Sequence, residues 1–267
     1  MVNNISFPAL GLSFTVNRSL FSVFGVDIYT YGLLIAAGLL LAFAYAVREA
    51  DRVGLRQDDL LNLFLIAVPV SIVCARAYYV IFSWSDYKSN PIDIFNIREG
   101  GLAIYGGVIG AVAVIVTYCR AKKIGIGKVL DILAIGLLIG QAIGRWGNFV
   151  NGEAFGRETT LPWAMKIVTD GVLVTSGAHP TFLYESLWNV IGIAVLTLYK
   201  KKTVFQGELF CGYITWYGIG RAIIEGLRTD SLYLGAFRVS QILSVLLAVA
   251  GIVIIIAGRK NTEKASE

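Results

Sequence analysis

Three arginines interrupt otherwise apolar stretches of this chain: Arg76, Arg145 and Arg221. An ionised side chain at the centre of a bilayer costs about 2.5–3.5 kcal/mol on insertion scales, so it persists where it is paired, hydrated or used. A guanidinium donates hydrogen bonds as a planar fork that matches phosphate and carboxylate oxygens. The three positions are therefore the first candidates for an anion-binding site. For Arg76, a structural ion pair or snorkelling toward an interface is the alternative.

Polar residues accompany Arg145 at helical spacing. Gln141, Arg145 and Asn148 are spaced i, i+4 and i+7, so they share one face of a helix, and Asn151 and Glu153 follow at its end. Five glycines between positions 140 and 156 allow the backbone to approach a ligand closely or to open the helix. A guanidinium flanked by amides is suited to binding a phosphate.

Arg221, Glu225 and Arg228 repeat the same spacing. The plain interpretation is a salt-bridge ladder within one helix, with Glu225 as its structural counter-ion. One glutamate between two arginines nevertheless leaves a positive surplus, which predicts an anionic partner. On the outer side of a membrane the abundant candidate is a phospholipid head group.

Two tyrosines and one histidine complete the candidates. Glycines flank Tyr105, and Tyr31 precedes Gly32, so either hydroxyl can meet a close partner, although an interfacial tyrosine is commonly only an aromatic anchor. The lone histidine, His179, precedes a proline suited to a helix start, and Glu185 lies just inside that helix. A structural, hydrogen-bonded role is the alternative for His179.

Composition places these residues in a membrane. Hydrophobic residues make up 56% of the 267 and charged residues only 15%, with a mean hydropathy of +0.69, whereas soluble domains carry about 25% charged residues. About 20 apolar residues cross a bilayer as a helix. We predict an all-α polytopic membrane protein in which 1–267 form a single integral membrane domain. Seven spans are expected, at about 27–47, 60–82, 102–119, 129–149, 181–199, 207–226 and 239–258.

Lysines and arginines between the spans predict the orientation. Thirteen lie on one set of alternate loops, and seven, Arg98 among them, lie on the other. The positive-inside rule then puts the N-terminus outside and the C-terminus in the cytoplasm. The outer loops 83–101 and 150–180 contain apolar aromatic residues, so they are expected to form a small external cap at the membrane surface. The first 26 residues lack a basic start and a continuous apolar core, so no cleavable signal peptide is expected.

Several function classes are excluded by composition. The net charge of +5 comes from short clusters between apolar runs, which is typical of membrane topology rather than of nucleic-acid binding. One histidine and three cysteines without CxxC spacing exclude a Cys/His metal cage. We therefore expect no metal, no cofactor and no nucleic-acid partner.

The polar segment that contains Arg145 resembles the signature GR-x-GN-F-x-N-x-E-x-x-G of the prolipoprotein diacylglyceryl transferase family. Other blocks that resemble this family are spread in order over most of the chain. The signature segment is Gly144-Arg145-Trp146-Gly147-Asn148-Phe149-Val150-Asn151-Gly152-Glu153-Ala154-Phe155-Gly156, and the other blocks are Tyr31-Gly32-Leu33, Gly100-Gly101-Leu102, Tyr105-Gly106-Gly107, His179-Pro180-Thr181, Leu183-Tyr184-Glu185, Arg221…Glu225…Arg228-Thr229-Asp230 and Gln241…Leu243-Ser244.

The resemblance implies a specific reaction in the bacterial cell membrane. The family transfers the diacylglyceryl group of phosphatidylglycerol to the lipobox cysteine thiol of a preprolipoprotein, which forms a thioether and releases glycerol phosphate. By resemblance, Arg145 contacts the lipid head group, and Tyr31, Asn148, Glu153 and Arg221 are essential. Expected partners are phosphatidylglycerol, the signal-peptide and lipobox segment, and membrane lipid.

One departure concerns proton transfer. Many family members have His-Gly-Gly where this chain has Tyr105-Gly106-Gly107, and Phe182 replaces a more usual polar residue. A phenol titrates near 10 and a free thiol near 8.5, so an unassisted tyrosine is a poor base at neutral pH. The identity of the general base therefore stays open.

Our hypothesis is that Arg145 and Arg221 bind the lipid phosphate and that Asn148 and Asn151 add hydrogen bonds. The positive field would lower the pKa of the incoming thiol, and Tyr105 would relay or orient the proton. A transporter or channel for an anionic solute is the first alternative, and a structural, lipid-binding scaffold is the second. Supporting roles fall to Arg76, Glu225, Arg228, His179 and Glu185.

Overall fold

The computed structural model describes residues 1–267 except 24–25, 98–99, 230, 232, 236 and 267. Arg98, one of the expected outer cations, and Asp230, part of the family resemblance, lie outside the described residues. The chain divides into two compact units, one of Met1–Tyr45 with Leu130–Glu267 and one of Ala46–Val129.

All seven expected spans are helical. Their bounds lie within a few residues of the predicted ones, except that the last helix extends eight residues further along the chain. They are α1 (Thr30–Ala50), α2 (Gln57–Phe82), α4 (Ile104–Lys122), α5 (Ile126–Asn151), α6 (Thr181–Tyr199), α7 (Glu208–Glu225) and α8 (Val239–Ser266).

Within the described ranges, six helices are long and apolar enough to cross a membrane. Of the seven expected spans, α7 does not belong to this group of six, because its 18 residues include three charged ones, Glu208, Arg221 and Glu225. The structure is therefore that of a mostly helical, polytopic membrane protein.

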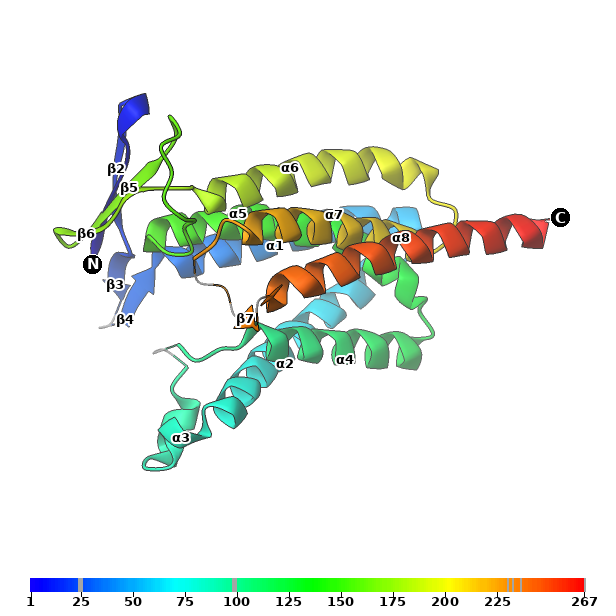
Figure 1. Cartoon of the computed structure of the whole chain (residues 1–267). Helices are drawn as coiled ribbons and strands as arrows, with labels where there is room; N and C mark the ends of the chain where they lie inside the picture. The colour runs from blue at the N-terminus through cyan, green and yellow to red at the C-terminus, as the bar shows by residue number, and fades with distance from the viewer. Residues whose placement is uncertain (24–25, 98–99, 230, 232, 236, 267) are drawn as a thin grey trace. The chain divides into compact units, whose positions relative to one another are not determined.

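The larger unit is built around α5, α6 and α7. Their core contains Ile135 and Leu138 of α5, Leu196 of α6, and Leu209 and Tyr213 of α7. Helix α7 packs against both α6 and α8. Figure 1 shows α5, α6 and α7 side by side, with the sheet at the end where α5 finishes and α6 begins. The same end of this unit therefore carries the C-terminus of α5 and the N-terminus of α6.

The expectation of an all-α chain needs correction, because the larger unit also contains strands. A four-stranded antiparallel sheet has the order β2 (Leu12–Asn17), β1 (Val2–Phe7), β5 (Met165–Thr169) and β6 (Val172–Ala178). Two further hairpins are β3–β4 and β7–β8. Their bounds are Ser19–Val23, Val26–Tyr29, Tyr233–Leu234 and Phe237–Arg238.

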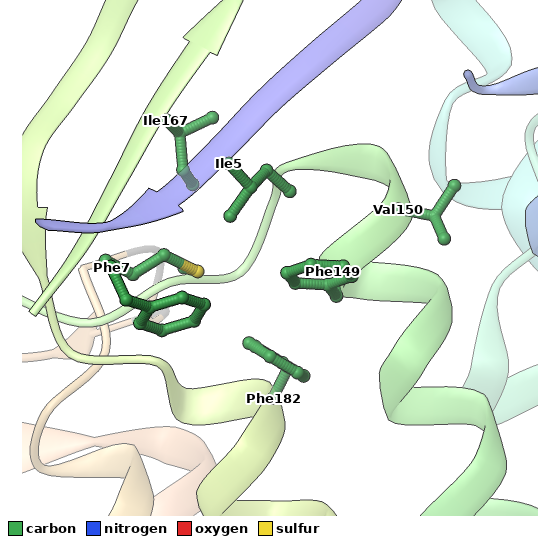
Figure 2. Packing of buried hydrophobic residues seen from close by; sticks show 7 residues of the cluster. Ile5, Phe7, Phe149, Val150, Ile167 and Phe182 are labelled. Carbon is green, nitrogen blue, oxygen red and sulfur yellow. The ribbon is translucent and has the colours of Figure 1, made fainter. Parts of the chain in front are cut away.

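Apolar side chains join this sheet to the helix ends. Ile5 of β1 is opposite Ile167 of β5, and both are fully buried against Phe149 of α5 and Phe182 of α6 (Figure 2). Asn3 adds a polar tie, because its amide donates to the carbonyl of Val150 at 2.7 Å and its side-chain oxygen accepts from Thr169. The sheet thus fixes the ends of α5 and α6.

The smaller unit consists mainly of α2 packed against α4. Between these helices the chain forms α3 (Trp84–Tyr87) and the 3-10 helix η3 (Pro91–Phe95). Two other 3-10 helices, η2 (Asp51–Val53) here and η4 (Lys200–Lys202) in the larger unit, follow α1 and α6, and η1 (Pro8–Leu10) joins β1 to β2.

Candidate active site

One carboxylate connects arginines from three different segments of the larger unit. Glu185, in the first turns of α6, is 2.7 Å from Nη2 of Arg145 on α5 and 3.2 Å from Nη1 of Arg221 on α7. It also lies 3.5 Å from Nη1 of Arg228, which follows α7. Arg145 and Arg221, which the sequence predicted as partners of one anion, therefore share a carboxylate.

A second carboxylate, Glu225, lies 2.7 Å from Nη2 of Arg221. These two residues form the predicted i, i+4 pair, and the Glu225 side chain is only 2% exposed. Arg238, the last residue of β8, donates to the backbone carbonyl of Glu225. We call Arg145, Arg221, Arg228, Glu185 and Glu225 the arginine cluster. Its three guanidinium groups and two carboxylates leave one formal positive charge.

The amides that follow Arg145 extend the network outward. Nη1 of Arg145 donates to Asn148 at 3.3 Å, and the amides of Asn148 and Asn151 each donate to Glu153 at 3.1 Å. Glu153 is exposed, so its carboxylate is accessible at the edge of this network. The carbonyl of Asn151 accepts from Arg18 at 2.7 Å, a contact that sequence reasoning did not anticipate. The end of α5 is thus a continuous polar surface that leads to Arg145.

Tyr31 also belongs to this region. Its ring packs on Gly147, between Arg145 and Asn148 in the chain, and a Cβ added at Gly147 would lie 2.5 Å from Cδ2 of Tyr31. Residue 147 must therefore be glycine for this aromatic contact. The Tyr31 side chain remains 37% exposed. The structure thus places one further residue of the family resemblance next to the Arg145 turn.

Two hydrogen bonds hold α5 and α6 together beside the cluster. Trp146 donates to Ser186 at 3.2 Å, and Ser186 donates to the carbonyl of Ala142 at 2.9 Å. Residues 146 and 186 each follow a member of the ion pair Arg145–Glu185 in sequence. These bonds therefore fix the helix register that lets the ion pair form. One turn deeper, Gln141 donates to Tyr213 of α7.

His179 lies between β6 and α6, outside the spans. Its Nδ1 is 3.1 Å from the hydroxyl of Tyr184, which also accepts a hydrogen bond from Trp163. Burial, and then the charge of Arg157, lower the pKa of His179, so the imidazole is neutral at neutral pH. His179 also packs against Gly156, where an added Cβ would lie 2.7 Å from the Cβ of His179. These contacts are those of a residue with a structural, hydrogen-bonded role, which was the alternative for His179.

Arg76 and Tyr105 belong to the smaller unit. The Arg76 guanidinium donates to five backbone carbonyls, those of Asp93, Ile94, Asn96, Gly100 and Gly101, at 2.7–3.0 Å. Its five N–H groups are thereby matched to the segment between α3 and α4, which makes Arg76 a structural residue of that segment. Tyr105, in the first turn of α4, is 47% exposed, and its ring lies 6.4 Å from that of Tyr78.

Replacing Arg76 by lysine should destabilise the smaller unit by about 3 kcal/mol or more, because one ammonium cannot replace five charge-assisted hydrogen bonds. Thermal unfolding in detergent and limited proteolysis within 83–97 measure the effect. Arg120→Lys is the matched control, since Arg120 is an exposed arginine of the same unit. An unchanged melting temperature for Arg76→Lys would show that the carbonyl contacts contribute little.

The fold and the site together define a class of protein: a polytopic membrane protein with a partly buried arginine cluster where α5 ends and α6 begins. The family model described as prolipoprotein diacylglyceryl transferase matches residues 18–257, and the chain belongs to this family.

Three relatives are named phosphatidylglycerol–prolipoprotein diacylglyceryl transferase. The one from Clostridioides difficile (strain 630) is 47% identical over 253 residues, which cover 94% of this chain and 100% of that protein. The one from Enterococcus faecalis (strain ATCC 700802 / V583) is 48% identical over 92% of each chain. The one from Finegoldia magna (strain ATCC 29328 / DSM 20472 / WAL 2508) is 46% identical over 94% of this chain and 100% of that protein.

Proposed function

We propose that this protein transfers the diacylglyceryl group of phosphatidylglycerol to the lipobox cysteine of a preprolipoprotein. The observation that carries the proposal is the shared carboxylate: Arg145 and Arg221, from different helices, converge on Glu185 in a chain of this family. A site that holds two guanidinium groups around one anionic group can also hold them around a phosphate.

The reaction is a displacement at carbon. The cysteine sulfur attacks the glycerol carbon that bears the phosphate, the carbon–oxygen bond breaks, and glycerol phosphate leaves while the thiol loses its proton. Arg145 and Arg221 stabilise the negative charge that develops on the leaving phosphate. Asn148 and Asn151 add donors, and Glu153 orients both amides. The same positive field lowers the pKa of the thiol and favours its reactive thiolate form.

Tyr105 is the proposed proton-relaying residue, and Tyr105→Phe tests it. We expect the transfer rate to fall about tenfold, less than the 100-fold or more typical of a general base, because the arginines already favour the thiolate. Initial rates from a peptide-lipidation assay measure this. Tyr29→Phe, at another exposed tyrosine, is the control and should react at the wild-type rate. An unchanged rate for Tyr105→Phe would leave Tyr105 as a membrane anchor.

The proposal includes a topology. Seven helices, α7 among them, cross the bacterial cytoplasmic membrane, with the N-terminus outside and the C-terminus in the cytoplasm. The chain then acts as one membrane domain, with residues 83–101 and 150–180 in an external cap. The end of α5 that carries Asn148, Asn151 and Glu153 would face the outer leaflet. Cysteine labelling of single exposed positions in intact cells tests this orientation.

The decisive experiment mixes detergent-purified protein with phosphatidylglycerol and a lipobox peptide. Mass spectrometry should show that the peptide gains one diacylglyceryl group, and a Cys-to-Ser peptide should gain none. Diacylglycerol, which lacks the phosphate leaving group, should not replace phosphatidylglycerol. If no mass is gained while the protein in liposomes conducts an anionic solute, the transporter alternative holds instead.

A further inference from the structure

The most connected residue of the arginine cluster is a carboxylate that the reaction above leaves without a role. Glu185 contacts Arg145, Arg221 and Arg228 at 2.7, 3.2 and 3.5 Å. Each of these guanidinium groups belongs to a different segment of the chain, so Glu185 is the group that holds them together. It also faces the donors that the proposed function assigns to the lipid phosphate.

The charges of substrate and product differ. The phosphodiester of phosphatidylglycerol carries one negative charge, whereas a phosphate monoester, with a second pKa near 6, carries between one and a half and two at neutral pH. Glycerol phosphate should therefore bind a cluster of bare guanidinium groups more tightly than the substrate does. Such a site would be inhibited by its own product. Carboxylates within the cluster offset this excess attraction.

Exposure and space favour an exchange of anions at Glu185. The Arg145 side chain is 23% exposed and that of Glu185 only 7%, so an incoming phosphate reaches Arg145 from the open side while Glu185 contacts it from within. A small pocket of about 10 Å³ adjoins Glu185 and Arg221, and the polar residues Asn189 and Tyr217 are among those that line it. This space is about the minimum that admits one water, so a carboxylate displaced from the arginines has polar groups and room for hydration beside it.

We infer that Glu185 is an internal counter-anion that the phosphate partly displaces on binding and that reclaims the guanidinium groups when glycerol phosphate leaves. This inference rests on the proposed function and adds a positioning residue that controls product release. It predicts that Glu185 weakens the binding of anions that the site is built to hold. If Glu185 were merely structural, its loss would disorder the arginines and would therefore weaken anion binding.

Glu185→Gln tests the inference, since glutamine keeps a hydrogen-bond acceptor and removes the charge. We expect the Kd for glycerol phosphate to fall by about tenfold or more, which corresponds to about 1.4 kcal/mol. Turnover should fall, and a burst of one lipidated peptide per enzyme should precede a slow steady state, because product release becomes limiting. Equilibrium binding of glycerol phosphate and rapid-quench kinetics provide the two readouts.

The arms of the binding experiment separate charge from lipid recognition. Inorganic phosphate should also bind Glu185→Gln more tightly, glycerol should be unaffected, and phosphatidylglycerol should gain less than glycerol phosphate because it carries less charge. Glu208→Gln is the matched control: Glu208 is a buried glutamate 2.6 Å from Arg259, and it begins α7 whereas the cluster lies toward the end of that helix. Its anion affinity should equal that of the wild type.

Weaker or unchanged binding of glycerol phosphate by folded Glu185→Gln overturns the inference. Should that variant not fold, Glu185→Asp serves, because aspartate keeps the charge but is one methylene too short to contact all three arginines. Its Kd for glycerol phosphate should fall about threefold, and an unchanged or higher Kd overturns the inference. A different result would show that the proposed function is wrong: the wild-type protein would bind these anions but would lipidate no peptide.

Discussion

Replacing Arg145 by glutamine should lower the rate of thioether formation by about 100- to 1,000-fold, the usual loss when one donor to a developing negative charge is removed. The protein should nevertheless remain folded. Glu185 keeps its contacts with Arg221 and Arg228, so no buried carboxylate loses all of its partners. Initial rates with phosphatidylglycerol and a lipobox peptide, read beside the melting temperature, should therefore separate catalysis from stability.

Two further variants sharpen this experiment. Arg145→Lys keeps the charge but loses the planar fork that bonds Glu185 and Asn148 at once, so its rate should lie between those of wild type and Arg145→Gln. Arg157→Gln is the control, because Arg157 is an exposed arginine of the segment after α5. Activity of Arg145→Gln within a few fold of wild type would remove Arg145 from the reaction.

The helices could be predicted from the sequence, because each contains a long apolar run that only a bilayer or a large core can cover. The polar residues within them were also informative. The spacing of Arg221 and Glu225 predicted a contact within one helix, and the structure has it at 2.7 Å. Spacing in the sequence therefore predicts those contacts of the site that lie within a single helix.

The sheet was missed, although part of its signal is visible. Residues 166–174 read Lys-Ile-Val-Thr-Asp-Gly-Val-Leu-Val, and Asp-Gly between β-branched runs is a strong hairpin signal. Asp170 and Gly171 indeed adopt φ of +48° and +83° between β5 and β6. The pairing of β1 with β5 could not be predicted in this way, because it joins positions more than 150 residues apart.

The central role of Glu185 could not be predicted for the same reason. Nothing in its sequence neighbourhood shows that α6 presents it to arginines on α5 and α7. That arrangement depends on helix packing, which is set by contacts such as Trp146 with Ser186. Family resemblance identified the candidate site residues individually, but only the structure shows the ion pairs and hydrogen bonds that connect them.

Arg221→Gln should lower the transfer rate about as much as Arg145→Gln does, and it should also destabilise the protein. The loss of stability makes the two arginines distinguishable. Arg221 is 2.7 Å from Glu225, whose side chain is 2% exposed. Removing one partner of a buried ion pair costs about 3–5 kcal/mol, because the remaining charge is left poorly compensated. The melting temperature should therefore fall clearly for Arg221→Gln but only slightly for Arg145→Gln.

The double variant Arg221→Gln/Glu225→Gln separates the two effects of Arg221. Neutralising Glu225 as well removes the uncompensated charge, so stability should recover by most of the amount lost, while the transfer rate stays about 100-fold or more below wild type. If stability and the transfer rate both recovered, Arg221 would serve only to neutralise Glu225. If neither recovered, the Arg221–Glu225 pair would not be the source of the stability loss. Recovery of stability without recovery of the rate is the result expected of a guanidinium that both neutralises a buried carboxylate and binds the leaving phosphate.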